Sequence, residues 1–388
     1  MNKMPRRKPL KVMHLINDLG SGGAQKIIFD LVREIDRERF LPIVGLWGKK
    51  WGHEMIEHFV GSNIEVVDFQ ARSKFDLKSL YSIYSYLSRN SIDILHTHLF
   101  LMHVIGRLAG KWAKVPWIVS THHNLLQANN MGTRVLERLT SPLSDVTTSV
   151  SRAAQKSHFS TSEEFSVDGL RSGRKHFTIY NSVNTEEIKR TARNVNIGQT
   201  RHELGLNDEF VFACVGRLHP SKGHKYLIEA VAHLRETHPS IRLLIVGDGP
   251  LQKEFIEQAH ARGLREQIYF LGYRDDVYTI LAASDALVQP SLFEGFGLAS
   301  AEAMACGLPV ISTDLPSIAE VVLHEKTGLL VPPGDSHALS KAMATFVDNP
   351  ALAATYGAHG KQRVEEMFSS EVIAQQYEVL YNTLFEMS

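Results

Sequence analysis

Two glutamates, Glu294 and Glu302, follow an apolar segment at 286–289 that predicts a strand. Gly297 lies in the turn after this strand, and a helix is predicted from Leu298. The free N–H groups and positive dipole end of a helix N-terminus suit an anion such as a pyrophosphate, and carboxylates accept hydrogen bonds from sugar hydroxyls. The spacing therefore indicates a site for an anionic, hydroxyl-rich ligand. The plainer interpretation is a pair of solvated helical glutamates.

A second loop carries two cations, Arg217 and Lys222, between a predicted strand at 210–215 and a helical pattern. Gly216 and Gly223 flank them and permit close approach of the backbone to a ligand. Two fixed cations at a strand-to-helix loop can neutralise a diphosphate leaving group. The plainer interpretation is that both side chains form surface ion pairs.

Together these segments resemble the retaining GT-B glycosyltransferases of family 4, also called glycosyl transferases group 1. That family carries a G-R-L-x-x-x-K-G loop and an E-x7-E motif in its C-terminal domain, and both are matched here. Further agreement is spread over the chain, at 20–25, 244–250, 270–273, Glu320 and 327–329. The segment 180–184 departs from the family's usual P-N-G-V-D, which leaves the role of Asn181 open.

The resemblance implies a role for each matching residue. The expected catalytic residues are His98, Arg217, Lys222 and Glu294. The expected donor-binding residues are Gly22, Gly23, Gly216, Arg217, Lys222, Glu294, Phe296, Gly297, Leu298 and Glu302. The expected acceptor-binding residues are Gly22, Gly23, His98, His122, His123 and Asn124. By the same resemblance Glu294 binds sugar hydroxyls, Glu302 binds the ribose, and the leaving phosphate takes the acceptor proton during front-face attack.

Histidines crowd two predicted strand ends, as His96 and His98 and as His122 and His123. A metal site is the alternative to consider, because histidine is the commonest metal ligand. No acidic or cysteine partner accompanies these histidines at characteristic spacing, so we expect no metal and no cofactor besides the nucleotide sugar. His98 is expected beside the reacting sugar, and His96 in the core.

Short apolar strands alternate with helical patterns through both halves of the chain, which predicts α/β architecture with parallel sheets. The expected fold is GT-B, with two Rossmann-like domains that face a cleft between them. The expected boundaries are an acceptor domain at 1–185, a polar linker at 186–200, a donor domain at 201–365 and a C-terminal segment at 366–388. Helices predicted at 351–367 and 371–385 are expected to cross back to the first domain, as they do in proteins that this chain resembles.

The composition is ordinary for a soluble two-domain protein: 388 residues, 44% hydrophobic and 22% charged. The two cysteines, Cys214 and Cys306, have neither metal nor disulfide spacing, which favours reduced thiols and a cytosolic compartment. No apolar run long enough to span a membrane and no signal peptide are found in the sequence. A cytoplasmic protein is expected.

The zero net charge hides an asymmetry between the halves. Residues 1–194 hold 28 Lys and Arg against 18 Asp and Glu, and the remainder holds 14 against 24. Basic residues are frequent at the start of the chain, at Lys3, Arg6, Arg7, Lys8 and Lys11. Such a split suggests an anionic partner for the first half, for which the cytoplasmic face of a membrane is a candidate. A solvated basic face with no partner is the alternative. No nucleic-acid-binding module accompanies the charge.

The sequence therefore predicts a glycosyltransferase that moves a hexosyl or N-acetylhexosaminyl group from a UDP-sugar, with retention, to a lipid-linked glycan. Such a reaction belongs to the synthesis of cell-surface polysaccharide or glycoconjugate. Two alternatives stay open at this point. One is a sugar-nucleotide 2-epimerase of the same architecture, and the other is a sugar-nucleotide binding protein without catalytic activity.

Overall fold

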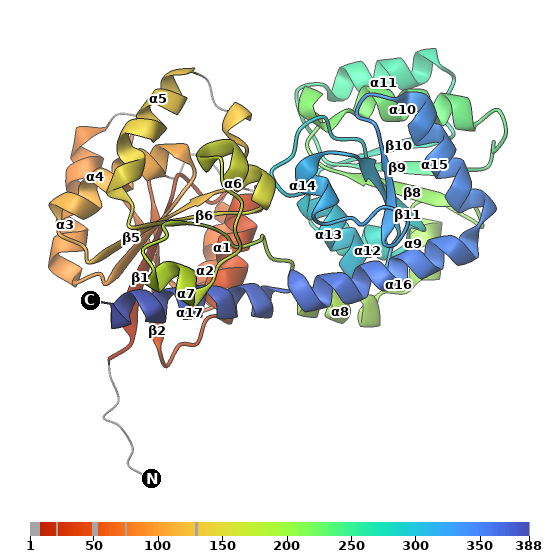
Figure 1. The fold of residues 1–388 in the computed structure, drawn as a ribbon. Helices are drawn as coiled ribbons and strands as arrows, with labels where there is room; N and C mark the ends of the chain where they lie inside the picture. The colour runs from red at the N-terminus through yellow and green to blue at the C-terminus, as the bar shows by residue number, and fades with distance from the viewer. Residues whose placement is uncertain (1–7, 21, 49–52, 74–75, 129–130, 388) are drawn as a thin grey trace, which may run out of the picture. The chain divides into compact units, whose positions relative to one another are not determined.

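The structure is a computed structural model, and it describes residues 8–20, 22–48, 53–73, 76–128 and 131–387 of the chain. The chain divides into two compact units. The first consists of the described residues up to Ser182 together with those from Ser370 on, and the second is Val183–Ser369. The C-terminal end of the chain therefore belongs to the same unit as its beginning (Figure 1).

The first unit is built on a parallel sheet of seven strands in the order β3-β2-β1-β4-β5-β6-β7. Its strands are β1 (Leu10–Ile16), β2 (Phe40–Leu46), β3 (Glu65–Asp68), β4 (Ile94–His98), β5 (Trp117–His122), β6 (Val146–Ser149) and β7 (His176–Thr178). The order reverses between β1 and β4, where His14 lies opposite His96. Ligands of open α/β sheets bind beyond the strand ends at such a switch point.

Helices pack on both faces of this sheet, with the apolar side chains of β1, β2 and β4 in the core beneath them (Figure 1). They are α1 (Gly23–Glu34), α2 (His53–Gly61), α3 (Leu77–Asn90), α4 (Phe100–Trp112), α5 (Met131–Thr140), α6 (Arg152–Phe159), α7 (Val167–Arg171) and α17 (Ser370–Glu386), with short 3-10 turns at Leu126–Ala128 and Ser141–Leu143. α3 begins at Asp76, whose carboxylate accepts hydrogen bonds from the N–H groups of Lys78 and Ser79 and so caps the helix.

The last helix, α17, packs against α1 and α7 of the first unit. Its buried Tyr381 hydroxyl lies 2.6 Å from His96 Nδ1, so the end of the chain contributes to the base of the first sheet. The helix before it, α16 (Pro350–Met367), packs instead on helices of the second unit. The expectation that both final helices cross back is therefore wrong for α16, because its buried face fits the second unit.

The second unit has a parallel sheet of six strands in the order β10-β9-β8-β11-β12-β13. The strands are β8 (Val211–Val215), β9 (Arg242–Val246), β10 (Ile268–Gly272), β11 (Ala286–Gln289), β12 (Val310–Thr313) and β13 (Gly328–Val331). The helices are α8 (Thr185–Asn194), α9 (Ile197–Glu203), α10 (His224–Leu234), α11 (Gln252–Ala261), α12 (Val277–Ala282), α13 (Leu298–Ala305), α14 (Pro316–Ala319), α15 (Ser336–Asp348) and α16, with a 3-10 turn at Pro220–Lys222. The prediction of two Rossmann-like units with parallel sheets is confirmed.

The segment 186–200, predicted as a linker, forms α8 and most of α9 and belongs to the second unit. Asn184 and Asn196 cap the two helices, because each side chain accepts a hydrogen bond from an N–H three residues on. The segment is strongly polar, and Thr185 and Ile188 are the residues of α8 that are buried.

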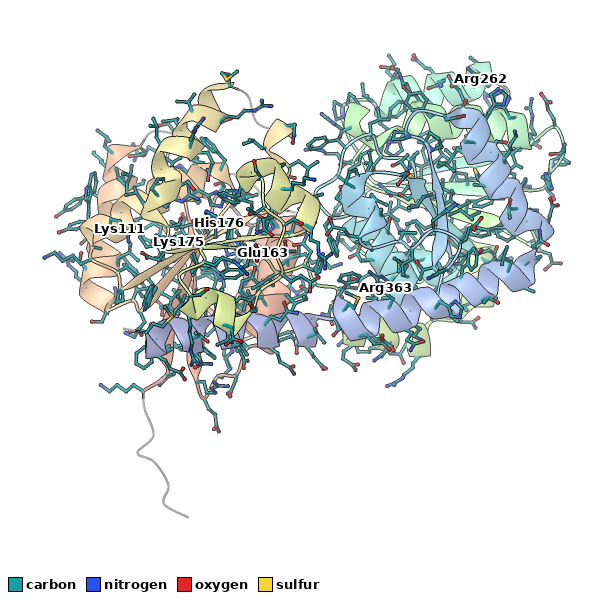
Figure 2. The ribbon with its side chains drawn as sticks, viewed as in Figure 1. Lys111, Glu163, Lys175, His176, Arg262 and Arg363 are labelled. Carbon is teal, nitrogen blue, oxygen red and sulfur yellow. The ribbon has the colours of Figure 1, made fainter. Side chains whose placement is uncertain are left out.

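α16 packs closely against the short helix α13. A Cβ at Gly357 of α16 would lie 2.0 Å from the carbonyl oxygen of Gly307, so only glycine permits this approach. Arg363, marked in Figure 2, donates to the carbonyl oxygens of Glu320 at 2.7 Å and Val321 at 3.0 Å. In the described ranges, no helix is both long and apolar enough to cross a membrane.

Candidate functional site

The two loops singled out by sequence follow adjacent strands of the second sheet. β8 pairs directly with β11, through Phe212 with Ala286 and Ala213 with Leu287. The strand order reverses between these two strands. The loops after β8 and β11 therefore meet at the switch point, where open α/β sheets bind nucleotides.

Hydrogen bonds and an ion pair join the two loops. The N–H of Leu292 donates to the carbonyl oxygen of Ser221 at 2.8 Å. Lys222 Nζ pairs with Glu294 Oε1, which also accepts a hydrogen bond of 3.1 Å from Ser291 Oγ. Gly223 has φ +69°, and a Cβ there would lie 2.0 Å from the carbonyl oxygen of Pro290. This position requires glycine, and the close approach brings Lys222 beside Glu294.

The N-terminus of α13 has the features of an anion site. Gly297, at φ +94°, is the N-cap residue and provides no side-chain hydrogen bond to the first turn. A Cβ at Gly297 would lie 2.4 Å from Ile318 Cδ1, so another residue would force this side chain to shift as well as strain the backbone. Phe296 is buried and packs edge-on against Phe368, with ring centroids 5.4 Å apart. Phe296 therefore anchors the turn, and the N–H groups from Leu298 on start the helix without a side-chain cap.

The remaining donor-site candidates differ in environment. Glu302 is buried in α13 and accepts a hydrogen bond of 3.2 Å from the Tyr278 hydroxyl. Arg217 directly follows Gly216 at the end of β8, is exposed, and forms no ion pair with any residue that the structure describes. The ion-pair interpretation therefore holds for Lys222 and not for Arg217.

In the first unit, three of the predicted histidines lie in one hydrogen-bonded region. His98 contacts His14 through Nε2 and His123 through Nδ1, both at 3.1 Å. His96 uses both ring nitrogens, towards Tyr381 and Thr121, each at 2.6 Å. Burial lowers the pKa of His14 and His123 to about 3. The pKa of His98 lies well below its ordinary value, mainly because the side chain is buried and also because other histidines lie nearby. These imidazoles are neutral at pH 7.

Predicted acceptor residues line a cavity of about 790 Å³ in the first unit. His122, His123 and Asn124 form part of its floor. The walls are mainly apolar and come from α3, α4 and α5, with Leu77, Leu80, Phe100, Leu101, Val104, Ile105, Leu108 and Leu136. A cavity of this size and lining is typical of small-molecule sites.

Gly22 and Gly23 lie elsewhere in the first unit, at the start of α1. Gly22 is the N-cap residue with φ −95°, an ordinary conformation, and α1 has no side-chain cap. The preceding Gly20 N–H donates to the Asp18 carboxylate at 3.0 Å. Ser21, between them, is outside the described residues. The geometry is that of a helix N-terminus open to a ligand.

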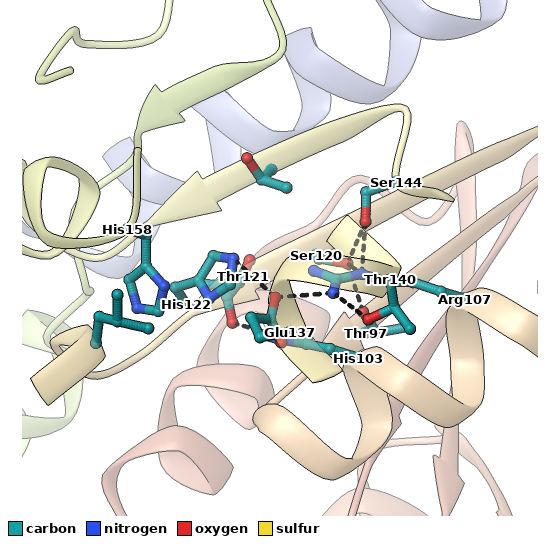
Figure 3. A network of polar contacts seen from close by, with 12 residues as sticks. Thr97, His103, Arg107, Ser120, Thr121, His122, Glu137, Thr140, Ser144 and His158 are labelled. Carbon is teal, nitrogen blue, oxygen red and sulfur yellow. Dashed lines mark hydrogen bonds and ion pairs between the residues drawn. The ribbon is translucent and has the colours of Figure 1, made fainter. Parts of the chain in front are cut away.

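A buried polar network that sequence reasoning missed lies beside the cavity (Figure 3). Arg107 of α4 is fully buried and donates to Glu137 Oε1 of α5 at 2.7 Å, to Ser144 at 2.8 Å and to Ser120 at 3.1 Å. Burial raises the pKa of Glu137, but His103 and Arg107 outweigh burial and bring that pKa to about 2. Glu137 is therefore ionised.

The network also corrects the reason given for excluding a metal. Glu137 is an acidic neighbour of His122, at 3.6 Å, and of His103, at 3.5 Å. Sequence spacing gave no sign of this contact, because it depends on how α4, α5 and β5 pack together.

Two Rossmann-like units with these strand orders and a nucleotide-type site define a GT-B fold. The HepE protein of Anabaena, solved with UDP and glucose, has TM-score 0.81 and 23% identity, covering 96% of this chain and 100% of that one. Sucrose-phosphate synthase of Thermosynechococcus elongatus has TM-score 0.77 and 23% identity, covering 98% and 100%.

Family models and sequence relatives agree with the fold. The model "Glycosyl transferases group 1" matches residues 196–363, and "Glycosyltransferase Family 4" matches 21–187. The Escherichia coli UDP-Gal:alpha-D-GlcNAc-diphosphoundecaprenol alpha-1,3-galactosyltransferase is 32% identical over 71% of this chain and 72% of its own length. The N-acetyl-alpha-D-glucosaminyl L-malate synthase of Bacillus anthracis is 28% identical over 79% of each. The chain belongs to the group 1 glycosyltransferases of family 4.

Proposed function

We propose that this glycosyltransferase transfers a hexosyl or N-acetylhexosaminyl group from a UDP-sugar to a lipid-linked saccharide, with retention of anomeric configuration. Synthesis of a cell-surface polysaccharide or glycoconjugate is the setting proposed, at the cytoplasmic face of the membrane. The observation that carries the proposal is the junction of the two loops after β8 and β11, with Lys222, Glu294 and the open N-terminus of α13.

The donor chemistry follows from this junction. Cleavage of the bond between the anomeric carbon and phosphate leaves negative charge on the diphosphate, and fixed positive groups lower the barrier by stabilising it. Arg217, Lys222 and the α13 N-terminus provide such groups. In the free protein Glu294 neutralises Lys222. A bound diphosphate competes for the ammonium group, and the released Glu294 carboxylate then accepts hydrogen bonds from sugar hydroxyls.

Retention is proposed by front-face attack, in which the acceptor oxygen approaches from the side that the phosphate leaves and the phosphate takes its proton. His98 is proposed beside the reacting sugar. Its neutral ring donates or accepts hydrogen bonds without adding charge. Since two side-chain cations and a helix dipole already face the diphosphate, we expect donor binding and bond cleavage to need no divalent ion.

The acceptor proposal rests on the cavity of the first unit. Its polar floor, with His122, His123 and Asn124, suits a saccharide, and its apolar walls suit the first part of a hydrocarbon chain. The E. coli relative supports a lipid-linked acceptor, since its name specifies UDP-Gal as the donor and a diphosphoundecaprenol-linked sugar as the acceptor. The HepE structures contain UDP, UDP-glucose, or UDP and glucose.

Exposed apolar side chains on helices of the first unit support docking at a membrane. Leu77, Tyr81, Trp112, Met131, Val135 and Leu139 are exposed on α3, α4 and α5, by 51–77%. Exposed basic residues on or next to the same helices are Lys78, Lys111, Lys114 and Arg138. Together these residues, the α3–α5 face, combine apolar insertion with attraction to anionic lipid. Of the basic residues at the start of the chain, Lys3, Arg6 and Arg7 lie outside the described residues.

The membrane proposal is tested with vesicles. Vesicles with anionic lipid should retain the protein at low salt, and neutral vesicles should retain it less. Added salt should release it, since charges are screened over about 8 Å at physiological ionic strength. The variant Tyr81→Ser with Trp112→Ser should bind more weakly, whereas Ile197→Ser, which removes an exposed apolar residue of the second unit, should not. Equal recovery from neutral and anionic vesicles at low salt would contradict membrane docking.

The function itself is tested with purified protein and a panel of nucleotide sugars. We expect a UDP-sugar to raise the melting temperature, because a ligand that binds only the folded state stabilises it. With a diphosphate-linked lipid saccharide, the product should be an α-glycoside when the donor is α-linked. Release of UDP and an altered sugar without acceptor would favour a 2-epimerase instead. Stabilisation without turnover for any acceptor would favour the binding protein.

A further inference from the structure

Two ring nitrogens and one carboxylate oxygen face one another beside the acceptor cavity without hydrogen-bond partners. They are His103 Nδ1, His122 Nε2 and Glu137 Oε2, each buried and unpartnered among the described residues. The ligand-type atoms of these three residues all lie within 4.8 Å of one another. A buried polar atom without a hydrogen-bond partner lowers the stability of the folded protein. Three such atoms that face one another therefore indicate that a further group binds between them.

The orientation of His103 is fixed by the backbone. His103 Nε2 lies 3.0 Å from the carbonyl oxygen of Thr121, and a carbonyl can only accept, so Nε2 carries the hydrogen. In the neutral ring, Nδ1 then presents a lone pair towards the Glu137 carboxylate. A histidine that ligates a metal commonly donates its other N–H to a carbonyl in this way.

The distances distinguish a metal ion from a direct hydrogen bond. His103 Nδ1 lies 3.5 Å from Glu137 Oε2, and His122 Nε2 lies 3.6 Å from Glu137 Oε1. Both exceed the ordinary length of a hydrogen bond. Ligands at 2.0–2.1 Å from a tetrahedral zinc are about 3.3 Å apart, whereas octahedral ligands at the same bond length are about 2.9 Å apart. The two separations, each measured to a different oxygen of Glu137, are closer to the tetrahedral value than to the octahedral one.

We propose that His103, His122 and Glu137 bind a divalent transition-metal ion, of which zinc fits best, in the first unit. Two imidazoles and a carboxylate form a known ligand set for zinc with one open position. The three residues also line the 790 Å³ cavity, and a water molecule from that cavity completes the coordination. Arg107 holds Oε1 of Glu137 and fixes the carboxylate, in the role of an outer-shell partner.

A second group of three histidines, His14, His96 and His98, meets the same distance criterion but differs in its bonding. His14 Nδ1 contacts His98 Nε2 at 3.1 Å, and His96 uses both nitrogens towards Tyr381 and Thr121. Hydrogen bonds already occupy those nitrogens, and His14 Nε2 is the one ring nitrogen of this described group that lacks a partner. The proposal therefore concerns the first group, and the second provides the matched control.

The experiment measures metal content and binding in the full chain, purified without an oligohistidine tag. Wild type from zinc-containing medium should hold about one zinc ion per chain, and replacement by Co²⁺ should give the visible absorption of a tetrahedral site. His122→Leu should lower metal affinity by about 100-fold or more, since even outer-shell changes cost 10–100-fold. Glu137→Gln should do the same. His14→Leu should leave metal content unchanged.

His122→Leu keeps the test valid if Glu137→Gln folds poorly. Removal of an unpartnered buried nitrogen should preserve folding, and UDP binding by the second unit reports whether the variant is folded. Zinc should raise the melting temperature of wild type and not that of His122→Leu. A wild-type protein without metal, Co²⁺ spectrum or zinc-dependent stabilisation would overturn the proposal. Zinc binding that survives His122→Leu but is lost in His14→Leu would overturn it as well.

Discussion

The two units of this glycosyltransferase hold their polar groups in opposite ways. In the second unit, Arg217, Lys222 and Glu294 lie on loops at the strand ends and are at least partly reached by solvent. In the first unit, a set of buried histidines is neutral, and an ion pair between Arg107 and Glu137 is buried inside the protein. The arrangement in the second unit suits a charged donor that binds and is released. The arrangement in the first unit is uncharged, which agrees with the proposed role of these histidines in binding the hydroxyl groups of an acceptor.

This difference predicts that loss of the buried ion pair lowers the free energy of unfolding more than loss of an exposed ion pair. Glu137→Leu leaves Arg107 charged and unpaired in the interior, and we expect a loss of about 3–5 kcal/mol in the free energy of unfolding. Chemical denaturation measures it. Glu163→Leu, which removes an exposed partner of Arg174, should cost no more than about 1 kcal/mol. Equal losses for the two variants would show that Arg107 is compensated elsewhere.

Cations of the second unit should affect the rate and not the stability. Arg217→Ala and Lys222→Ala should each lower kcat by roughly 10² to 10³, because each removes charge stabilisation from the leaving diphosphate. Steady-state kinetics with a lipid-linked acceptor measure this. The exposed Lys225, three positions further along, provides the control, and Lys225→Ala should leave the rate unchanged. Near-normal transfer by both variants would place the diphosphate elsewhere.

Acid should destabilise the first unit before the second. The pKa of His14 and His123 is lowered to about 3 in the folded chain, against about 6.5 when unfolded, so the unfolded state binds more protons below pH 6.5. Stability is therefore full above pH 6.5 and falls by about 1.4 kcal/mol per pH unit for each such histidine as pH decreases towards 3. Hydrogen exchange at pH 7 and pH 5 should show earlier opening of the first sheet. Uniform behaviour of both sheets would contradict the contrast.

The smallest effect is expected at Tyr278. Tyr278→Phe removes the hydrogen bond to Glu302 and should weaken UDP binding by about 1 kcal/mol, whereas Glu302→Ala should weaken it more. Calorimetric titration of both variants with UDP measures this, and kcat at saturating donor should change little. A fall in kcat with unchanged UDP affinity would give Glu302 a role in the reaction itself.

Local pattern was enough to predict most of the fold. Alternating apolar strands and helices identified both sheets, and the segment predicted as a strand at 286–289 is β11 without any shift. The polar helices α8 and α9 were missed although Asn184 and Asn196 are of capping type and α8 has acidic residues in its first turn and Arg193 in its last. Segments with few buried side chains give little periodicity.

The donor site around Lys222 and Glu294 was easier to predict from the sequence than the buried network around Glu137. Lys222 and Glu294 lie in loops that directly follow strands, so motif spacing and strand order together indicate that they meet. Glu137 lies on an amphipathic helix in which it and Thr140 are buried, and nothing near it in sequence shows that Arg107, His103 and His122 surround it. Such a site depends on the packing of three elements. Sequence spacing alone does not encode it.

The return of α17 to the first unit has a consequence for synthesis of the protein. The Tyr381 hydroxyl that bonds His96, and the helix that covers α1, come from residues that follow the whole second unit in the chain. Domains generally fold as units, N-terminal first, during synthesis. Here the N-terminal unit cannot close until α17 has been synthesised, and the second unit, Val183–Ser369, is by then complete. The order of folding should therefore be the reverse of the order of synthesis, and a nascent chain without α17 should expose the base of its first sheet to chaperones.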